Sequence, residues 1–228
     1  MYRISYHGGY SHEAVVYALR DCGIRHIDTA KRYGCEEALA KAVAESRVPR
    51  DDLWITTKLW PYDYGYHSAK QACLASSARL GVDYLGLCHA IGVSNFLISH
   101  LEELKDDCGI VPHVNQVEFH PFQQPWDLVR YCQKEGIAFQ GFCPLAKGQA
   151  LSHPLILGLA EKYGRSASQI CIGWSIQNGV ITIPKSTNPQ RIFEICQVFG
   201  FQLEEKDMAL IGTLHDERHV SWDPTLVK

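Results

Sequence analysis

Several signals that would point to other classes of protein are missing from this chain. No apolar run approaches the roughly 20 residues that a membrane-spanning helix needs. No Gly-x-Gly-x-x-Gly fingerprint occurs, so a Rossmann domain is not indicated. The formal charge of −3 gives no reason to expect nucleic acid or an anionic membrane as a partner. Residues 1–7 lack the apolar core of a signal peptide, so we expect a cytoplasmic protein.

Paired cysteine motifs are also missing. The chain has nine cysteines, but the number is odd and no Cys-x-x-Cys pair occurs. This pattern argues against a disulfide framework and against a zinc site. Four of the cysteines fall inside apolar helical patterns, where a free thiol acts as a small hydrophobic side chain: Cys22, Cys132, Cys171 and Cys196. We expect reduced thiols and no metal.

Short apolar runs alternate with longer helical patterns, which indicates βα units and a parallel sheet. With 228 residues the chain can form one core, and we expect a single domain over residues 1–228. The expected strands are Arg25–Thr29, Leu53–Leu59, Tyr84–Val93, His113–Phe119, Ile137–Cys143 and Val180–Ile183, with Tyr2–Tyr6 as a short seventh. The expected helices are Glu13–Cys22, Cys35–Ser46, His67–Leu80, Ser99–Asp107, Trp126–Gln133, Pro154–Tyr163, Ser166–Asn178, Pro189–Cys196 and Glu204–His215.

Three residues near predicted strand ends could perform acid catalysis together. Asp28 lies in the run HIDTA, Tyr33 follows at once, and Lys58 lies in the run ITTKLW. A phenol has a reference pKa of about 10, but a neighbouring ammonium favours the phenolate, and a carboxylate keeps that ammonium charged. Such a group can protonate a carbonyl oxygen. The alternative is a strand-end salt bridge beside a half-buried tyrosine.

Six sequence words occur in a fixed order: HIDTAKRYG, ITTKLW, IGVSNF, VNQVEFHP, IPKSTNPQRI and SWDP. Together they resemble the aldo-keto reductase family of NADPH-dependent carbonyl reductases, which fold as TIM (β/α)8 barrels. The resemblance runs from about Ser11 to Asp223. It implies an α/β barrel enzyme, a small-molecule aldehyde or ketone as substrate, NADPH/NADP+ as cofactor and a monomeric state. In the family the tyrosine donates the proton, which assigns this role to Tyr33 with Lys58 and Asp28.

The resemblance also assigns residues to the nicotinamide end of the cofactor. In the family, the residues matching Ser94, Asn95 and Gln116 hold the carboxamide. The segment containing Phe142, Pro144 and Leu145 resembles the one whose aromatic ring stacks on the nicotinamide. The alternative interpretations are strand-end caps for the polar residues and a core position for the phenylalanine.

The segment from Ile183 to Arg191 is the most specific cofactor signal. Pro189 begins a helix whose free amide groups and dipole favour an anion. Polar and charged side chains that would bind this anion are Lys185, Ser186, Asn188 and Arg191. By resemblance the 2′-phosphate binds here, which implies NADP(H) over NAD(H), and Glu194 lies near the adenine. The alternative is a solvated start of a helix.

The chain is short of two pieces of the family barrel. Between Trp60 and Ile91 the resemblance requires a helix, a strand, a second helix and a further strand, but the sequence supplies one helix and one apolar run. We infer that one βα unit, on the order of 30 residues or more, is missing near residues 85–90, as alternative splicing or a trimmed gene model would leave it. At the N-terminus, only Tyr2-Arg3-Ile4 resembles the end of the first strand. The expected fold is therefore an incomplete barrel of six to seven strands.

In the family, the missing unit carries a histidine that orients the substrate carbonyl. His89 precedes Asn95 by six residues, which is roughly 20 Å along a strand, so we do not expect it to substitute. Three hypotheses follow: a slowed reductase, an NADPH-binding protein without catalysis, and an inactive splice product that folds poorly.

Overall fold

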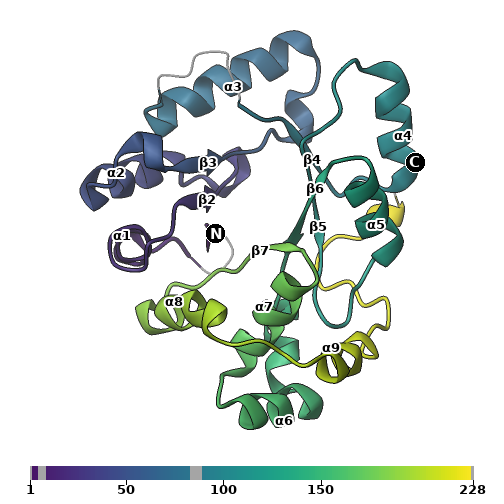
Figure 1. Cartoon of the computed structure of the whole chain (residues 1–228). Helices are drawn as coiled ribbons and strands as arrows, with labels where there is room; N and C mark the ends of the chain where they lie inside the picture. The colour runs from purple at the N-terminus through teal and green to yellow at the C-terminus, as the bar shows by residue number, and fades with distance from the viewer. Residues whose placement is uncertain (1, 5–8, 83–88, 227–228) are drawn as a thin grey trace. The chain divides into compact units, whose positions relative to one another are not determined.

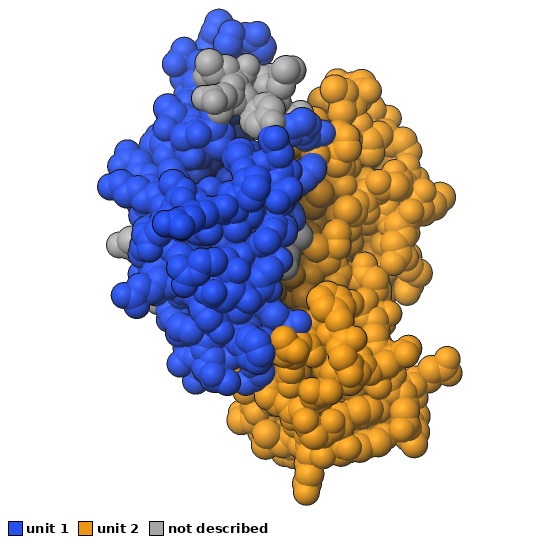
Figure 2. All heavy atoms as spheres, turned by 60° about the vertical axis from the view of Figure 1, so that its left-hand side comes forward, with its two compact units in different colours: residues 1–89, 185–196 blue, residues 90–184, 197–228 orange. Residues whose placement is uncertain are grey.

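A computed structural model of the chain describes residues 2–4, 9–82 and 89–226. The chain forms two compact units. Unit 1 contains residues 1–89 and 185–196, and unit 2 contains residues 90–184 and 197–228; Figure 2 colours them separately. The expectation of one domain over residues 1–228 stays a prediction.

Unit 1 is built on a three-stranded parallel sheet in the order β1-β2-β3. Arg3 pairs with Asp28, and Asp28 pairs with Thr56, so these residues lie at one level of the sheet. In Figure 1, α1 and α2 lie side by side near this sheet. The elements of this unit are β1 (Tyr2–Arg3), α1 (His12–Arg20), β2 (His26–Asp28), η1 (Lys31–Tyr33), α2 (Glu36–Ser46), η2 (Arg50–Asp52), β3 (Trp54–Thr56), η3 (Pro61–Asp63), α3 (Tyr66–Leu80) and α8 (Pro189–Cys196).

A buried carboxylate fixes the helices of unit 1 to the end of its sheet. Glu36, in the first turn of α2, is buried and accepts hydrogen bonds from Arg79 Nε of α3 at 2.7 Å and from Thr57 Oγ1 at 2.6 Å. A buried charge is stable only when it is paired and hydrogen-bonded. This network therefore holds α2, α3 and the residue after β3 in one arrangement, next to the position of Lys58.

Unit 2 is built on a four-stranded parallel sheet in the order β4-β5-β6-β7. Its core contains Phe119 stacked on Trp174, with ring centroids 5.1 Å apart. The capping box of Ser166 and Gln169 begins α7, which carries Trp174 into this core. The elements are β4 (Gly92–Ser94), α4 (Ile98–Asp107), β5 (Val114–Glu118), α5 (Trp126–Lys134), β6 (Ala138–Phe142), η4 (Ala146–Ser152), α6 (Pro154–Tyr163), α7 (Ala167–Gln177), β7 (Ile181–Ile183), η5 (Gln197–Gly200), α9 (Glu205–Gly212) and η6 (Pro224–Leu226).

The described strands number seven, within the predicted range, but they form two separate parallel sheets and no closed barrel. The predicted helices are all present, and α6 and α8 have the predicted bounds. The predicted strand Leu53–Leu59 is wrong at its end, because ladder pairing stops at Thr56. Of the predicted strand Tyr84–Val93, residues 84–88 lie outside the described residues, and residues 89–91 are not strand. An apolar run does not set strand length, which depends on the neighbouring chain.

Within the described ranges, no helix combines the length and apolar content needed to cross a bilayer. No disulfide joins the cysteines of those ranges.

The close packing of β6 gives a test of the unit 2 core. A Cβ added at Gly141 would lie 2.9 Å from both Phe119 Cβ and Val180 Cγ1, so we expect Gly141→Ala to destabilise the protein by about 1–3 kcal/mol. Gly158 is exposed in α6 with nothing within 4 Å of such a Cβ, and Gly158→Ala should stabilise by about 0.5–1 kcal/mol. Urea unfolding of both variants measures the two opposite signs. Equal stability of Gly141→Ala and the parent would contradict this description of the core.

Candidate active site

The three predicted catalytic side chains lie at or just after the carboxyl ends of β2 and β3, at one edge of the unit 1 sheet. β2 ends at Asp28, and η1 ends at Tyr33, after which Gly34 adopts a φ of 66°. This left-handed conformation is unfavourable for residues with a Cβ, which explains the glycine. Lys58 lies two residues beyond the end of β3. Because the carboxyl ends of parallel strands lie at the same edge, the three side chains converge there.

Asp28 and Lys58 form a close ion pair. Lys58 Nζ donates to the two carboxylate oxygens of Asp28 at 2.6 Å and 2.7 Å, and to the Thr29 carbonyl oxygen at 2.9 Å. The Asp28 side chain is 0% exposed, whereas that of Lys58 is 22% exposed. Burial lowers the pKa of Lys58, and the Asp28 carboxylate opposes this change because it favours the ammonium form. The pair therefore stabilises a cation at a poorly solvated sheet edge.

Tyr33 lies beside this ion pair with its side chain half-buried. Lys58 Nζ is 5.6 Å from the centroid of the Tyr33 ring. The Tyr33 hydroxyl accepts a hydrogen bond from Arg3 Nη2 at 2.8 Å, and the guanidinium carbon of Arg3 is 5.5 Å from the same ring centroid. The structure thus brings the three predicted residues together in unit 1 and adds Arg3 to them.

Sequence reasoning missed Arg3. The resemblance of Tyr2-Arg3-Ile4 to the end of a first strand was the only available signal, and it did not indicate which residue faces the site. The pairing of Arg3 with Asp28 across β1 and β2 supplies that information. Its position depends on register, which a two-residue strand does not specify by its own pattern.

His89 lies near the opposite end of β3 from Lys58. Its ring centroid is 6.5 Å from that of Trp54, the first residue of the strand, and its side chain is exposed. Lys58 follows the last residue of the strand. This arrangement supports the interpretation that His89 does not replace an orienting histidine.

The predicted phosphate-binding segment also belongs to unit 1. The Oδ1 of Asn188 accepts the backbone N–H of Arg191 at 3.1 Å and so caps the start of α8. The Oγ of Ser186 accepts the backbone N–H of Asn188 at 3.1 Å. Desolvation lowers the pKa of Lys185, so a bound anion would favour its charged form. Two of the predicted ligands therefore build the loop, while Arg191 is exposed and Glu194 is half-buried.

β1 connects this segment to the cluster of Asp28, Tyr33 and Lys58. The hydroxyl of Tyr2 donates a hydrogen bond to the Ser186 carbonyl oxygen. Burial raises the pKa of Tyr2, so this hydroxyl stays protonated as a donor. Because Tyr2 and Arg3 are adjacent, one short strand contacts both predicted parts of the unit 1 site.

Ser94, Asn95 and Gln116 lie together at the carboxyl edge of the unit 2 sheet. The Ser94 Oγ and the Asn95 backbone N–H both donate to the Gln116 carbonyl oxygen, at 3.0 Å and 2.9 Å. The Gln116 side chain in turn donates to Gln140 of β6. The Asn95 Oδ1 is buried and accepts no hydrogen bond from the residues that the structure describes. A carboxamide N–H would satisfy this acceptor, so the residues present fit a nicotinamide.

The Phe142 segment is less informative. Phe142 ends β6 and is 6% exposed, Pro144 is buried, and Leu145 packs partly buried against the unit 2 core. A core position, the alternative for Phe142, accounts for this burial. Its stacking on a nicotinamide stays a prediction.

A second buried carboxylate, in unit 2, holds the C-terminal segment. Glu118, the last residue of β5, accepts a hydrogen bond from His120 Nε2 at 2.9 Å. It also accepts the backbone N–H groups of Val220 and Ser221, at 2.7 Å and 3.2 Å. Buried His120 thus has a structural role as the partner of Glu118. The motif VEFHP contained both residues, but the sequence did not indicate that the distant tail binds them.

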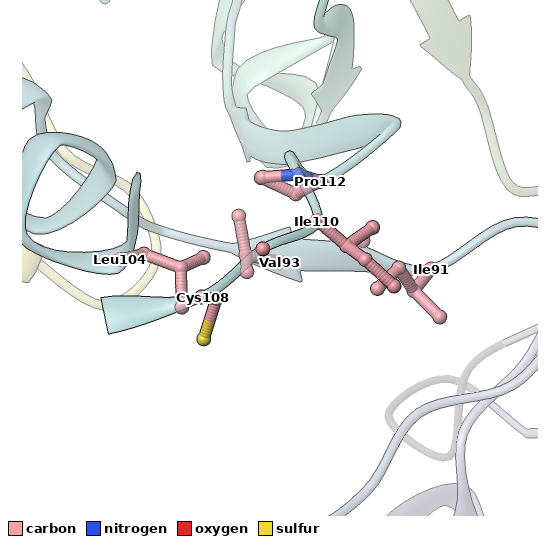
Figure 3. A pocket seen from close by; sticks show the side chains of 8 residues that line it. Ile91, Val93, Leu104, Cys108, Ile110 and Pro112 are labelled. Atoms are coloured by element: carbon pink, nitrogen blue, oxygen red, sulfur yellow. The ribbon is translucent and has the colours of Figure 1, made fainter. Parts of the chain in front are cut away.

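The most distinct hollow of unit 2 is separate from these residues. It encloses about 410 Å3 beside β4 and α4, and no predicted site residue lines it. Figure 3 shows apolar side chains around it, together with the Cys108 thiol. Its lining residues are Ile91, Gly92, Val93, Leu104, Cys108, Gly109, Ile110 and Pro112. Across the described part of the chain, no group of three or more His, Cys, Asp or Glu residues is placed to hold a metal ion.

Comparisons with known proteins agree on one family. The model of the aldo/keto reductase family matches residues 8–89 and 85–216. A glyoxal reductase of Bacillus subtilis is 38% identical over 243 positions, covering 95% of this chain and 87% of the relative. An aldo-keto reductase from a Medee basin deep-sea metagenome library has a TM-score of 0.94 at 33% identity, covering 100% and 94% of the two chains. A Bombyx mori aldo-keto reductase in complex with NADP has a TM-score of 0.90 at 30% identity, covering 96% and 90%.

The chain belongs to the aldo/keto reductase family of oxidoreductases. Its fold is of the family's barrel type with an incomplete set of strands, which confirms the predicted fold class. The alignment with the Bacillus relative spans 243 positions, more than the 228 residues of the chain, so it includes positions where this chain has no residue. The two family matches meet at residues 85–89, in the segment where the sequence predicts a missing unit.

The ion pair predicts a pH-dependent loss of stability in Asp28→Asn. Removing one partner of a buried pair costs about 3–5 kcal/mol, and we expect about 3 kcal/mol near neutral pH because Lys58 retains some exposure. The pKa of Lys58 in the folded protein is already lowered from 10.5 and should fall further in this variant. Between the lowered folded-state pKa and 10.5, Lys58 is protonated in the unfolded variant but not in the folded one, so folding releases a proton. The free energy of unfolding of the variant therefore rises with pH in this range, and its deficit relative to the parent shrinks.

Urea unfolding at about pH 7 and about pH 9.5 checks this pH dependence. The control is Asp21→Asn, which removes an exposed carboxylate 3.0 Å from Arg20 and should cost less than about 1 kcal/mol at both pH values. A deficit for Asp28→Asn that does not change with pH would contradict the assigned role of Lys58.

Proposed function

We propose that this chain is an NADPH-dependent reductase of small aldehydes or ketones, with Tyr33 as the proton donor. The observation that supports this most directly is the unit 1 cluster, in which a half-buried tyrosine lies beside a lysine paired with a fully buried aspartate. A structural salt bridge does not require a phenol beside its cation. A tyrosine that acts as a general acid requires a neighbouring cation, because the cation stabilises the phenolate left after proton transfer.

The residues of the chain have separate tasks in this proposal. Bound NADPH supplies the hydride. Tyr33 holds a proton on its hydroxyl oxygen and donates it to the carbonyl oxygen. Lys58 stabilises the resulting phenolate, and Asp28 keeps Lys58 charged and directed toward the site.

Two observations support NADPH as the cofactor. In unit 2, the buried Asn95 Oδ1 matches a carboxamide donor, which suits a nicotinamide. In unit 1, Lys185 and Arg191 flank the capped start of α8, where backbone amides favour a phosphate. The complex of the Bombyx mori relative with NADP supports the same assignment. Small carbonyl compounds are the proposed substrate class, since one relative is a glyoxal reductase.

We further propose that the reaction is slow, because the unit with the family's orienting histidine is missing near residues 85–90. A positioned polar group commonly contributes about 10²–10⁴ in rate. The length of the Bacillus alignment supports such a deletion, and so does the absence of a described strand pairing with β3 and β4 to join the two sheets. Alternative splicing, a cytoplasmic location and a monomeric state stay part of the proposal.

The same observations favour a second candidate, an NADPH-binding protein that does not turn over. Both predicted groups of cofactor residues occur in the chain, whereas the proposed deletion would remove the orienting histidine. The two candidates differ only in whether Tyr33 transfers its proton to a substrate.

Replacement of the proton donor decides between them. We expect Tyr33→Phe to lower NADPH-dependent reduction of a small aldehyde by about 10²–10⁴-fold while NADPH affinity stays unchanged. The control Tyr64→Phe removes the hydroxyl of a side chain that is 69% exposed, and it should keep full activity. Turnover is measured by NADPH absorbance and affinity by fluorescence quenching. If the parent binds NADPH without any turnover, the second candidate replaces the first.

Cofactor selectivity is tested at α8. Arg191→Gln should raise the dissociation constant for NADPH by roughly tenfold and leave that for NADH unchanged, because only NADPH has a 2′-phosphate for the guanidinium to bind. The control Lys41→Gln removes one positive charge from an exposed position of α2. Equal weakening of both cofactors by Arg191→Gln would argue against a 2′-phosphate site at this helix.

A further inference from the structure

Arg3 is fixed in place by the backbone and side chains on both sides of it. Tyr2 is buried and donates a hydrogen bond to the Ser186 carbonyl oxygen. Ile4 is also buried, and its N–H donates at 2.8 Å to the Asp28 carbonyl oxygen. Because both neighbours are anchored, the backbone of Arg3 is already ordered, and binding a partner costs only the rotamer freedom of its side chain. Arg3 is therefore built into the unit 1 site.

The hydrogen bond from Arg3 to Tyr33 has a defined direction. A guanidinium carries only donors and stays charged, so the Tyr33 oxygen is the acceptor of the 2.8 Å bond from Nη2. The phenol O–H proton is not used in this bond, so Tyr33 can donate it to another oxygen. When this proton leaves, the bond from Arg3 becomes a charge-assisted bond to an anion, which is stronger.

The charges of the cluster favour that change. Arg3 and Lys58 contribute two positive charges, and the Asp28 carboxylate contributes one negative charge. With neutral Tyr33 these groups have a surplus of one positive charge, and the phenolate removes it. Arg3 also acts on Lys58, since its charge contributes to lowering the Lys58 pKa.

We propose that Arg3 is a positioning residue for Tyr33, which holds the phenol oxygen and stabilises the phenolate formed when the proton is transferred. This inference rests on the proposed reductase function. In the reaction the Tyr33 O–H bond breaks and its proton goes to the carbonyl oxygen. Bound NADPH would supply the hydride and be oxidised to NADP+. The hydride's electron pair would form the new C–H bond, while the C=O π pair moves to the oxygen and takes the Tyr33 proton. Water then reprotonates the phenolate. Arg3 acts on the proton donor and not on the substrate.

The decisive test does not require turnover. Tyrosine is labelled with ¹³C at the ring carbon that bears the hydroxyl, and the Tyr33 signal is assigned as the one lost in Tyr33→Phe. The midpoint of its pH titration is then compared in the cofactor-free parent and in Arg3→Gln. We expect the midpoint to rise by roughly one unit or more when the guanidinium is removed. Arg3→Lys keeps the charge but loses the planar donor geometry, and its midpoint should lie between the two.

Arg32 provides the matched control. It lies within η1, one residue before Tyr33, but its guanidinium carbon is 4.2 Å from the Trp60 ring centroid. Arg32→Gln should leave the Tyr33 midpoint within a few tenths of a unit, because the exposed charge is screened by solvent. An equal shift in the two arginine variants would overturn the specific role of Arg3.

An unchanged Tyr33 midpoint in folded Arg3→Gln would also overturn the proposal. Weaker NADPH binding with an unchanged midpoint would do the same and would assign Arg3 to the cofactor. If Arg3→Gln does not fold, Arg3→Lys decides: a raised midpoint supports the proposal, and an unchanged one overturns it. If the parent shows no turnover, the proposed function fails, but the titration still reports whether Arg3 stabilises the phenolate.

Discussion

The buried carboxylate of Asp28 is the constraint on which the unit 1 site depends. A carboxylate with no exposure must be paired, and Lys58 is the cation that supplies this pairing. Asp28 is the last residue of β2, and Lys58 lies two residues beyond the end of β3, so the pair forms only when the two strands end at the same level of the sheet. Sheet register and ion pairing therefore support one another. Because Lys58 is itself poorly solvated, the carboxylate also keeps it charged. The carboxylate thereby maintains the Lys58 ammonium beside Tyr33, in a position where burial leaves little water to stabilise the charge.

Sheet continuity is the second constraint, and it separates this chain from a complete barrel. β3 ends one parallel sheet and β4 begins the other, with no described strand between them. β4 has three residues, and Ile91 just before it is 46% exposed. An apolar hollow lies beside β4 and α4, and Ile91 is among the residues that line it. The proposed deletion of one βα unit near residues 85–90 would account for the exposure of Ile91 and for the hollow.

The sequence predicted the class of fold, the helices and the proximity of Asp28, Tyr33 and Lys58, because these depend on local patterns. The apolar faces of α6 and α8 set their bounds, and Asp28, Tyr33 and Lys58 stand in distinctive words. The sequence did not predict features that depend on contacts between segments far apart in the chain. The end of β3, the contact of Arg3 with Tyr33 and the binding of the tail by Glu118 all depend on which chain lies alongside. Such contacts leave no periodic signal in the sequence.

The importance of β1 is therefore not measured by its length. Its two residues and the one that follows each contact a different part of unit 1: Tyr2 the phosphate segment, Arg3 the phenol, and Ile4 the backbone of Asp28. Because these contacts belong to consecutive residues, the register of β1 sets the positions of the Ser186 carbonyl, the Tyr33 hydroxyl and β2 relative to one another within unit 1. The cluster of Asp28, Tyr33 and Lys58 is therefore held by contacts that all lie inside unit 1.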